Sequence, residues 1–273
     1  MPHVISPEAE AILDKEFKVL DKGFVRLVDY MGSDQRIVAA ARVSYGKGTK
    51  TLREDRTLIH YLMRHAHTSP FEQVQLTFHC KMPIFVARQW IRHRTARLNE
   101  ISGRYSVMKD EFYLPTADSI RTQSAVNKQG RSEEQVAPEA AAKMILQLDE
   151  GQRRSYAEYE AFLKIGVARE LARIHLPLSL YTEWYWQIDL HNLFHFLELR
   201  LDEHAQYEIR QYAQVMAEMS RKVAPMAYEA FETYVLRSEV LGGEELEWIR
   251  DHLRDQEDIP PQLPGKLGLK PLE

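Results

Sequence analysis

Apolar and polar residues alternate along the chain with two different periods. A period of two covers residues 76 to 82, where every second residue is apolar: Leu76, Phe78, Cys80 and Met82. That alternation is typical of a strand with one buried face. Residues 23–32, GFVRLVDYMG, are also strand-like and lead into a Gly-Ser-Asp turn.

Most other segments have the helical period of 3.6 residues. The pattern predicts helices over residues 7–20, 33–45, 54–67, 83–94, 139–164, 167–176 and 189–223. Ser33 or Asp34 is expected to cap the second of these helices, and a break near Asp202 is expected in the last. Residues 121–137 are polar and are expected to form a mobile loop. Helices dominate over a few strands, which predicts the α+β class.

Composition narrows the class of protein. The 273 residues carry a net charge of -4, so a strongly basic nucleic-acid coat is excluded. A single cysteine allows no intrachain disulfide and favours a reducing compartment. No apolar run approaches about 18 residues, and acids interrupt the N-terminus where a signal peptide needs an apolar core. We therefore expect a soluble, cytoplasmic protein without membrane spans.

Positive charge is concentrated between residues 88 and 106. This stretch contains Glu100 as its only acid and five arginines: Arg88, Arg92, Arg94, Arg97 and Arg104. A helix over 83–94 would place Arg88 and Arg92 on one face. An extended chain over 99–106 would place Glu100, Ser102, Arg104 and Ser106 on another. Guanidinium groups beside hydroxyls suit a phosphorylated, planar ligand, but an arginine cluster paired with acids elsewhere remains open.

Residues 92–105, RHRTARLNEISGRY, resemble the signature of flavin-dependent thymidylate synthases, R-H-R-x-x-S-x-N-E-x-S-x-R-Y. The matching residues are Arg92, His93, Arg94, Asn99, Glu100, Ser102, Arg104 and Tyr105. Arg97 stands where the signature has its first serine, so the contact made at that position is open. The segments HAHTSPFEQ, ARIHLPLSLYTEWYW and LRLDEHAQYEIRQYA also resemble the family.

The resemblance implies a helix-rich single catalytic domain over residues 1–273, with a small, mostly antiparallel sheet flanked by helices. Its family-like core would span about 20–235, preceded by an N-terminal extension over 1–19. A C-terminal helix and a Pro/Gly-rich tail would occupy 240–273. The resemblance further implies a homotetramer with active sites between subunits.

The activity implied by the resemblance is reductive methylation of dUMP at C5 to dTMP. The carbon would come from 5,10-methylenetetrahydrofolate, and the reducing power from NADPH through FAD. Arg200 would be the catalytic residue that polarises the uracil ring. Its position off the apolar stripe of its helix leaves the side chain free to enter a site, although pairing with Asp202 or Glu203 is the alternative.

Further roles follow from the resemblance, position by position. The dUMP-binding residues would be Gln89, Arg92, Glu100, Ser102, Gly103, Arg104, Arg173 and Arg200. The FAD-binding residues would be Ser69, Arg92, His93, Arg94 and Glu100, together with Asp189, His191 and His195, where the family often has asparagine and arginine. His67 and Tyr105 would border the folate or nicotinamide pocket. Ser69 could alternatively cap a helix, and Arg173 could be a cation at a helix C-terminus.

Cys80 is the only thiol available for nucleophilic attack on a pyrimidine ring. It shares the apolar face of its predicted strand, and apolar surroundings raise the pKa of a thiol and leave it inert. The residues themselves therefore disfavour thiolate catalysis.

Two other functions fit parts of the sequence. His191, His195, Glu198 and Asp202 recur on one helical stripe and could bind a metal in a metal-dependent hydrolase. No H-E-x-x-H motif accompanies them, and we expect no metal. The arginine stretch could instead contact RNA, with Trp90 and Tyr105 stacking on bases, but the acidic balance favours no nucleic-acid partner.

Overall fold

The computed structural model describes residues 4–43, 52–126 and 128–253. In chain order, the elements of its first half are α1 (Pro7–Glu10), β1 (Glu16–Val19), β2 (Gly23–Met31), α2 (Asp34–Arg42), α3 (Leu52–Arg64), η2 (Phe71–Gln73), β3 (Gln75–Pro83), α4 (Ile84–Trp90), β4 (Arg97–Glu100), η3 (Ala117–Ser119), β5 (Arg121–Gln123) and β6 (Arg131–Gln135). The second half contains α5 (Pro138–Lys164), α6 (Arg169–Ala172), η4 (Arg173–His175), β7 (Tyr181–Asp189), α7 (Leu190–Leu201), α8 (Tyr207–Val223), α9 (Pro225–Phe231), η5 (Glu232–Leu236) and α10 (Gly243–Leu253).

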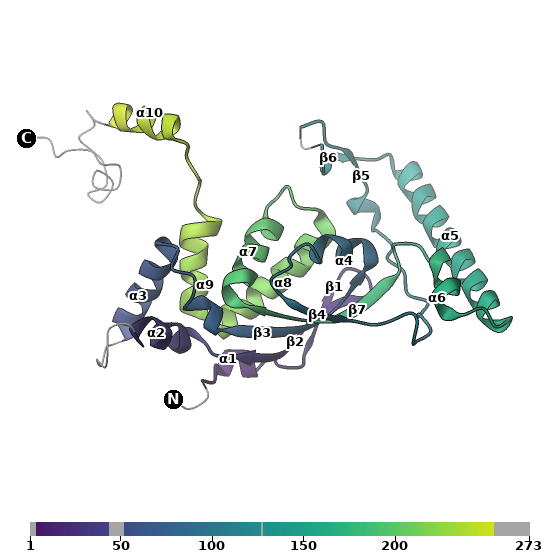
Figure 1. The fold of residues 1–273 in the computed structure, drawn as a ribbon. Helices are drawn as coiled ribbons and strands as arrows, with labels where there is room; N and C mark the ends of the chain where they lie inside the picture. Colours follow the sequence, from purple (N-terminus) through teal and green to yellow (C-terminus); the bar gives the residue numbers. More distant parts are fainter. Residues whose placement is uncertain (1–3, 44–51, 127, 254–273) are drawn as a thin grey trace, which may run out of the picture.

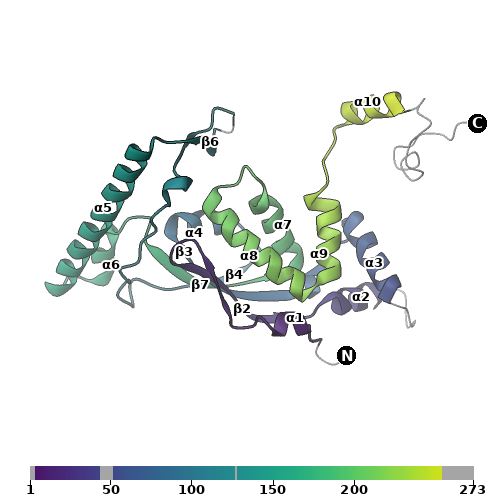
Figure 2. The ribbon, with the colours of Figure 1, turned by 180° about the vertical axis from the view of Figure 1, so that it is seen from behind.

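A five-stranded sheet lies at the centre of the fold, in the order β1-β2-β3-β7-β4, with every neighbouring pair antiparallel. Helices α4, α7 and α8 cover one face of this sheet, and α9 lies beside α8 (Figure 1). The view from behind shows the same layer of helices above the strands (Figure 2). The predicted α+β class is confirmed, as is a small antiparallel sheet flanked by helices.

Strands β3 and β7 form the middle of the core because each buries every second side chain. Leu76, Phe78, Cys80 and Met82 of β3 are fully buried, as the alternation predicted. In register with them, β7 contributes Thr182, Trp184, Trp186 and Ile188. Large aromatic side chains fit a pleated, half-buried surface well. The opposite face of the sheet carries partly exposed polar residues such as Arg26, His79 and Glu183.

A separate lobe is built on the long helix α5. Its small core consists of Met108, Phe112, Tyr159, Ala172 and Leu180. Helix α6 packs against α5, and the β5–β6 hairpin lies at the far end of the lobe (Figure 1). The loop predicted over 121–137 is therefore wrong in part, because β5 and β6 pair with each other. Their residues are polar, so no apolar alternation marked them as strands.

Several predicted helices end earlier than their sequence patterns indicated, and the one predicted over 54–67 ends at Arg64. The helix predicted over 7–20 is wrong beyond Glu10, because Asp14 adopts a φ of 57° and Glu16–Val19 pairs with β2. Residues 4–19 thus pack on the same core, where Ala9 and Val19 are buried. The helix predicted over 83–94 ends at Trp90, and Pro83 precedes its first turn. The break near Asp202 is confirmed, since α7 ends at Leu201.

Asp34 links the start of α2 to the start of α9. Ser33 is the N-cap of α2 but makes no side-chain capping hydrogen bond. The Asp34 carboxylate instead accepts hydrogen bonds from the backbone N–H groups of Met226 and Ala227, both at 2.9 Å. Burial raises the pKa of Asp34 to about 6, against the lowering effect of these two hydrogen bonds.

The C-terminal helix is present as predicted, and α10 lies apart from the body of the molecule, beyond α9, in both views (Figures 1 and 2). The predicted Pro/Gly-rich tail and the end of the second predicted helix, at residues 44–45, lie outside the described residues. Among the residues that are described, no helix combines the length and apolar character needed to cross a bilayer.

Candidate active site

The arginine-rich stretch is anchored by one buried aromatic residue. Trp90, the last residue of α4, is fully buried. Its indole stacks on Phe196 with the ring centroids 5.1 Å apart, and it meets Trp184 and Trp186 edge-on at 5.4 and 5.3 Å. Such contacts fix the ring in position. The residues that follow Trp90 are therefore held beside α7, on the surface of the core.

The five arginines of the stretch are exposed. Within the described ranges, only Arg104 has an acidic partner, since its Nε lies 3.3 Å from Glu170. The expectation that Arg88 and Arg92 share a helical face is wrong, because Arg92 lies beyond the end of α4. An unneutralised group of guanidinium cations at the surface is an arrangement that attracts an anionic ligand.

Arg200 meets the signature segment (residues 92–105) directly. Its Nε donates a hydrogen bond to His93 Nε2 at 3.1 Å. A cavity of about 340 Å³ opens at this contact and is lined by residues from α7, from the end of β7 and from the turn after α4: Arg92, His93, Arg94, Thr95, Ile188, Asn192, His195, Leu199 and Arg200. Five predicted site residues therefore share one cavity. Pairing of Arg200 with Asp202 or Glu203 is not found among the described residues.

His93 is a neutral acceptor in this contact. Burial, with help from the Arg200 and His195 charges, lowers the pKa of His93 to about 4. Because His93 Nε2 accepts from Arg200, the ring proton must lie on Nδ1. Burial also lowers the pKa of the Arg200 guanidinium. Arg200 thus remains a cation that is only half-buried and is oriented by an uncharged partner.

This geometry predicts a specific dependence of stability on pH. Between pH 6.5 and about 4, His93 takes up a proton in the unfolded chain but not in the folded one. The free energy of unfolding should therefore fall as the pH is lowered through that window. His93→Asn, which removes the titrating ring, should weaken this loss when melting temperatures are compared at pH 7.5 and pH 5. An equal loss in both proteins would show that His93 is ionised in the folded state.

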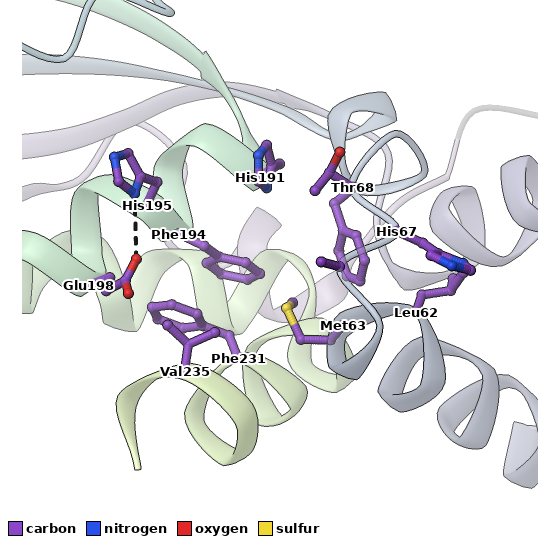
Figure 3. Close-up of a pocket in the computed structure, with 12 residues that line it drawn as sticks. Leu62, Met63, His67, Thr68, His191, Phe194, His195, Glu198, Phe231 and Val235 are labelled. Carbon is purple, nitrogen blue, oxygen red and sulfur yellow. Dashed lines mark hydrogen bonds and ion pairs between the residues drawn. The ribbon is translucent and has the colours of Figure 1, made fainter. Parts of the chain in front are cut away.

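A second cavity, of about 170 Å³, lies between α3, η2, α7 and the α9–η5 segment (Figure 3). Its apolar wall includes Leu62, Met63, Phe194, Phe231 and Val235, and its polar residues are His67, Thr68, His191, His195 and Glu198. His195 lines both cavities. Three predicted site residues, His67, His191 and His195, are thus brought together here from two distant segments.

The rest of the signature forms a turn against η4. The extended chain predicted over 99–106 is wrong beyond Glu100, because backbone N–H groups of Tyr105 and Ser106 both bond to the Ser102 carbonyl. Gly103 is buried, and a Cβ there would lie 3.1 Å from the side chain of Arg173. Glycine at position 103 therefore allows Arg173, from α6–η4, to approach the signature closely.

Several predicted site residues line neither cavity and make contacts elsewhere in the fold. Glu100 accepts a hydrogen bond from Thr182 Oγ1 at 2.5 Å. Asp189 caps α7, where its carboxylate accepts from the backbone N–H and the side-chain amide of Asn192 at 2.9 and 2.8 Å. Tyr105 is 77% exposed, and Ser69 is exposed without capping η2. Roles for these residues in ligand binding stay predictions.

Two polar residues of the first cavity are not among the predicted site residues. Thr95 and Asn192 line it beside Arg200. Asn192 follows the cap residue Asp189 by three positions and precedes His195 by three, so helical spacing placed it near a predicted site residue. Thr95 lies inside the signature segment at a position that the signature leaves unspecified.

Cys80 belongs to the core, as predicted. It is fully buried, and burial raises the pKa of its thiol well above the ordinary range. A thiol that ionises with such difficulty and has no access to solvent cannot attack a substrate.

The metal-binding alternative is not supported. No group of three or more His, Cys, Asp or Glu residues is placed to hold a metal ion in the described ranges. His195 contacts Glu198 at 3.4 Å. Asp202 lies beyond the last residue of α7, off the stripe of His191 and His195, and pairs with His204 at 2.9 Å.

The chain is similar over most of its length to proteins of one family. Residues 26–226 match the family described as thymidylate synthase complementing protein. The chain is 63% identical over 239 residues to the flavin-dependent thymidylate synthase of Treponema denticola. The aligned region covers 88% of this chain and 90% of the relative. It is 54% identical over 252 residues to the flavin-dependent thymidylate synthase of Wolbachia pipientis, covering 92% of this chain and 88% of the relative.

A solved structure shares the fold. The UMP/dUMP methylase PolB from Streptomyces cacaoi, crystallised with 5-Br dUMP, is 33% identical, with a TM-score of 0.73 over 80% of this chain and 98% of that one. The family match spans the signature segment, Arg173 and Arg200. Together with the relatives aligned along most of the chain, it shows that this protein belongs to the flavin-dependent thymidylate synthase family.

Proposed function

We propose that this enzyme methylates dUMP at C5 to give dTMP, with carbon from 5,10-methylenetetrahydrofolate and reducing power from NADPH through FAD. The observation that carries the proposal is the placement of Arg200. Its guanidinium lines a cavity with Arg92 and Arg94 and has no acidic partner among the described residues. Such a cation is free to bind an anion or to stabilise developing negative charge.

Arg200 would act on the uracil ring. When C5 becomes nucleophilic, negative charge develops on the N3/O2/O4 side of the ring, and a fixed cation stabilises that charge. The hydrogen bond from Arg200 to neutral His93 holds the guanidinium in place without cancelling its charge. The protein can thus activate the ring electrostatically, without a covalent bond to sulfur.

The remaining substrate contacts would come from the signature and its neighbours. Exposed guanidinium groups bind phosphate through paired hydrogen bonds, which suits Arg92, Arg104 and Arg173. Gln89, Glu100, Ser102 and Gly103 would complete the dUMP site. The close approach of Arg173 to Gly103 supports a shared role for them, because it brings two distant segments to one place.

The donor set also fits FAD. Unneutralised Arg92 and Arg94 suit a pyrophosphate, and the second cavity offers the apolar Phe194 and Met63 beside imidazoles. Ser69, Arg92, His93, Arg94, Glu100, Asp189, His191 and His195 would hold the cofactor. When bound, FAD would relay electrons from NADPH to the carbon that becomes the methyl group. His67 and Tyr105, both exposed, would border the folate or nicotinamide.

We further propose a cytoplasmic homotetramer whose sites lie between subunits. Large side chains in and beside the signature segment are exposed in the single chain, with Ile91 at 42%, Val107 at 50% and Tyr105 at 77%. Contact with a second copy would bury them and close the site around the arginines. Light scattering on the purified protein tests the assembly directly.

An absorbance spectrum tests the proposed function. The purified protein should be yellow, and NADPH should bleach the flavin band in a manner that depends on dUMP. Addition of a chelator should leave dTMP formation unchanged. A colourless protein whose activity disappears with the chelator would overturn the proposal.

The same proposal predicts that Cys80→Ala remains active. The substitution removes one buried sulfur from the apolar face of β3, at a cost of about 1 kcal/mol in the free energy of unfolding. Because the buried thiol takes no part in the reaction, kcat for dTMP formation should stay within about twofold of the wild type. A folded, flavin-loaded but inactive variant would contradict this.

A further inference from the structure

A chain of hydrogen bonds connects Gln89 to a buried carboxylate on another helix. Gln89, in the last turn of α4, donates from its Nε2 to Gln206 Oε1. Gln206, the N-cap of α8, donates from its own Nε2 to Glu208 Oε2 at 2.9 Å. Glu208 is only 2% exposed, although glutamate is rarely buried.

Two further donors hold the other oxygen of Glu208. Arg131, from β6, forms an ion pair with Oε1, and Tyr113 donates its hydroxyl to the same oxygen at 3.1 Å. Arg131 is itself fixed by a hydrogen bond from Nη1 to the Ser119 carbonyl at 2.7 Å. The carboxylate therefore has partners on both oxygens, and its orientation is set by the α5 lobe.

The direction of these hydrogen bonds is determined by Glu208. A carboxylate can only accept hydrogen bonds, so Gln206 must turn its NH₂ group towards Glu208. The side-chain carbonyl of Gln206 then faces Gln89, and Gln89 must donate a hydrogen bond to it from its NH₂ group. The carbonyl oxygen of Gln89 is consequently kept free of this contact and available as an acceptor.

We propose that Glu208 is a positioning residue for substrate binding, which acts through Gln206 to fix the amide orientation of Gln89 so that its carbonyl oxygen accepts from a donor on the nucleotide. The inference rests on the proposed function, in which Gln89 contacts dUMP. Neither Gln206 nor Glu208 needs to touch the substrate. The buried charge of Glu208 determines which way the amide groups of Gln206 and Gln89 point.

Glu208→Gln tests this orientation with the shape of the side chain kept. The new amide should keep its carbonyl oxygen on Arg131 and Tyr113, so its NH₂ group would face Gln206. The side-chain amide of Gln206 would then flip to present its carbonyl oxygen to residue 208 and its NH₂ group to Gln89. The amide of Gln89 would flip in turn, which turns its carbonyl oxygen away from the substrate. We expect the Kd and KM for dUMP to rise about tenfold or more, with a smaller fall in kcat and unchanged flavin content.

Moving the carboxylate from position 208 to position 206 should restore the direction of the hydrogen bond that Gln89 makes. In the double variant Glu208→Gln/Gln206→Glu, the new amide donates to the new carboxylate, which in turn accepts from Gln89 as Gln206 does now. The double variant should recover dUMP affinity to within about threefold of the wild type. Glu218→Gln is a matched control, because Glu218 is an exposed glutamate on the same helix, paired with Arg221.

The outcomes separate this inference from the proposed function. The dUMP affinities of the flavin-loaded proteins are measured by calorimetry, and their melting temperatures are checked in parallel. If the wild type binds dUMP and Glu208→Gln binds it equally well, or if the double variant is no better than the single one, the positioning role is overturned. A flavin-loaded wild type that binds no dUMP would overturn the proposed function itself.

Discussion

Replacing Arg200 by alanine is expected to lower the rate of dTMP formation by about 10²–10³-fold, the usual cost of removing one fixed group that stabilises transition-state charge. The side chain is half-buried and lies outside the apolar core, so the fold should persist. Flavin content should also persist, since Arg200 is not among the proposed FAD contacts. The measurement is kcat for dTMP, taken together with the flavin absorbance of the purified variant.

Two further variants make the Arg200 result specific. Arg200→Lys keeps a cation but loses the planar group that donates to His93, so its activity should fall between those of alanine and wild type. Arg221→Ala removes an exposed arginine that pairs with Glu218 and should leave kcat unchanged. Normal turnover in Arg200→Ala would mean that the uracil ring is polarised by another group.

Trp90→Ala should have the largest effect on stability, a loss of about 3–5 kcal/mol in the free energy of unfolding. The indole is fully buried and contacts Trp184, Trp186, Phe196 and Tyr212. Removing it leaves a cavity beneath the turn that carries Arg92 and His93. Chemical denaturation measures the loss, and any protein that remains folded should bind flavin poorly.

Trp248→Ala is the matched control for Trp90. Trp248 lies on α10 and is 62% exposed, with His252 stacked against it. Its removal should change the free energy of unfolding by less than about 0.5 kcal/mol. If the two tryptophan variants were equally stable, the aromatic cluster would not be the anchor of the signature segment.

Elements that follow one period could be predicted from the sequence. The alternation at Leu76, Phe78 and Cys80 gave β3, and the apolar stripe of residues 190–201 gave α7. Strand β7 has the same alternation, with Trp184, Trp186 and Ile188 buried between polar residues. Although β7 is not among the predicted strands, its alternation carries the same signal as that of β3.

Other features depend on distant contacts that local patterns do not record. The N-terminal helix is cut short because residues 16–19 find pairing partners in β2. The hairpin β5–β6 consists of polar residues and is tied to the fold partly through Arg131 and the buried Glu208. In both cases tertiary structure overrides a local preference.

The sequence names candidate site residues but does not give their geometry. The signature and the family resemblance named His93 and Arg200, which are 107 residues apart in the chain. Spacing alone could not show that they hydrogen-bond or that burial keeps His93 neutral. The relay from Gln89 to Glu208 was likewise invisible, because it joins the end of α4, the start of α8 and a hairpin that looked like a loop.

We propose that fixed cations, and no thiol, activate the pyrimidine ring. Intact-mass spectrometry of the protein, quenched during turnover of dUMP, tests it most directly. We expect dTMP to accumulate while Cys80 carries no nucleotide at any time. A nucleotide adduct on Cys80 that forms and decays at the rate of dTMP production would contradict it.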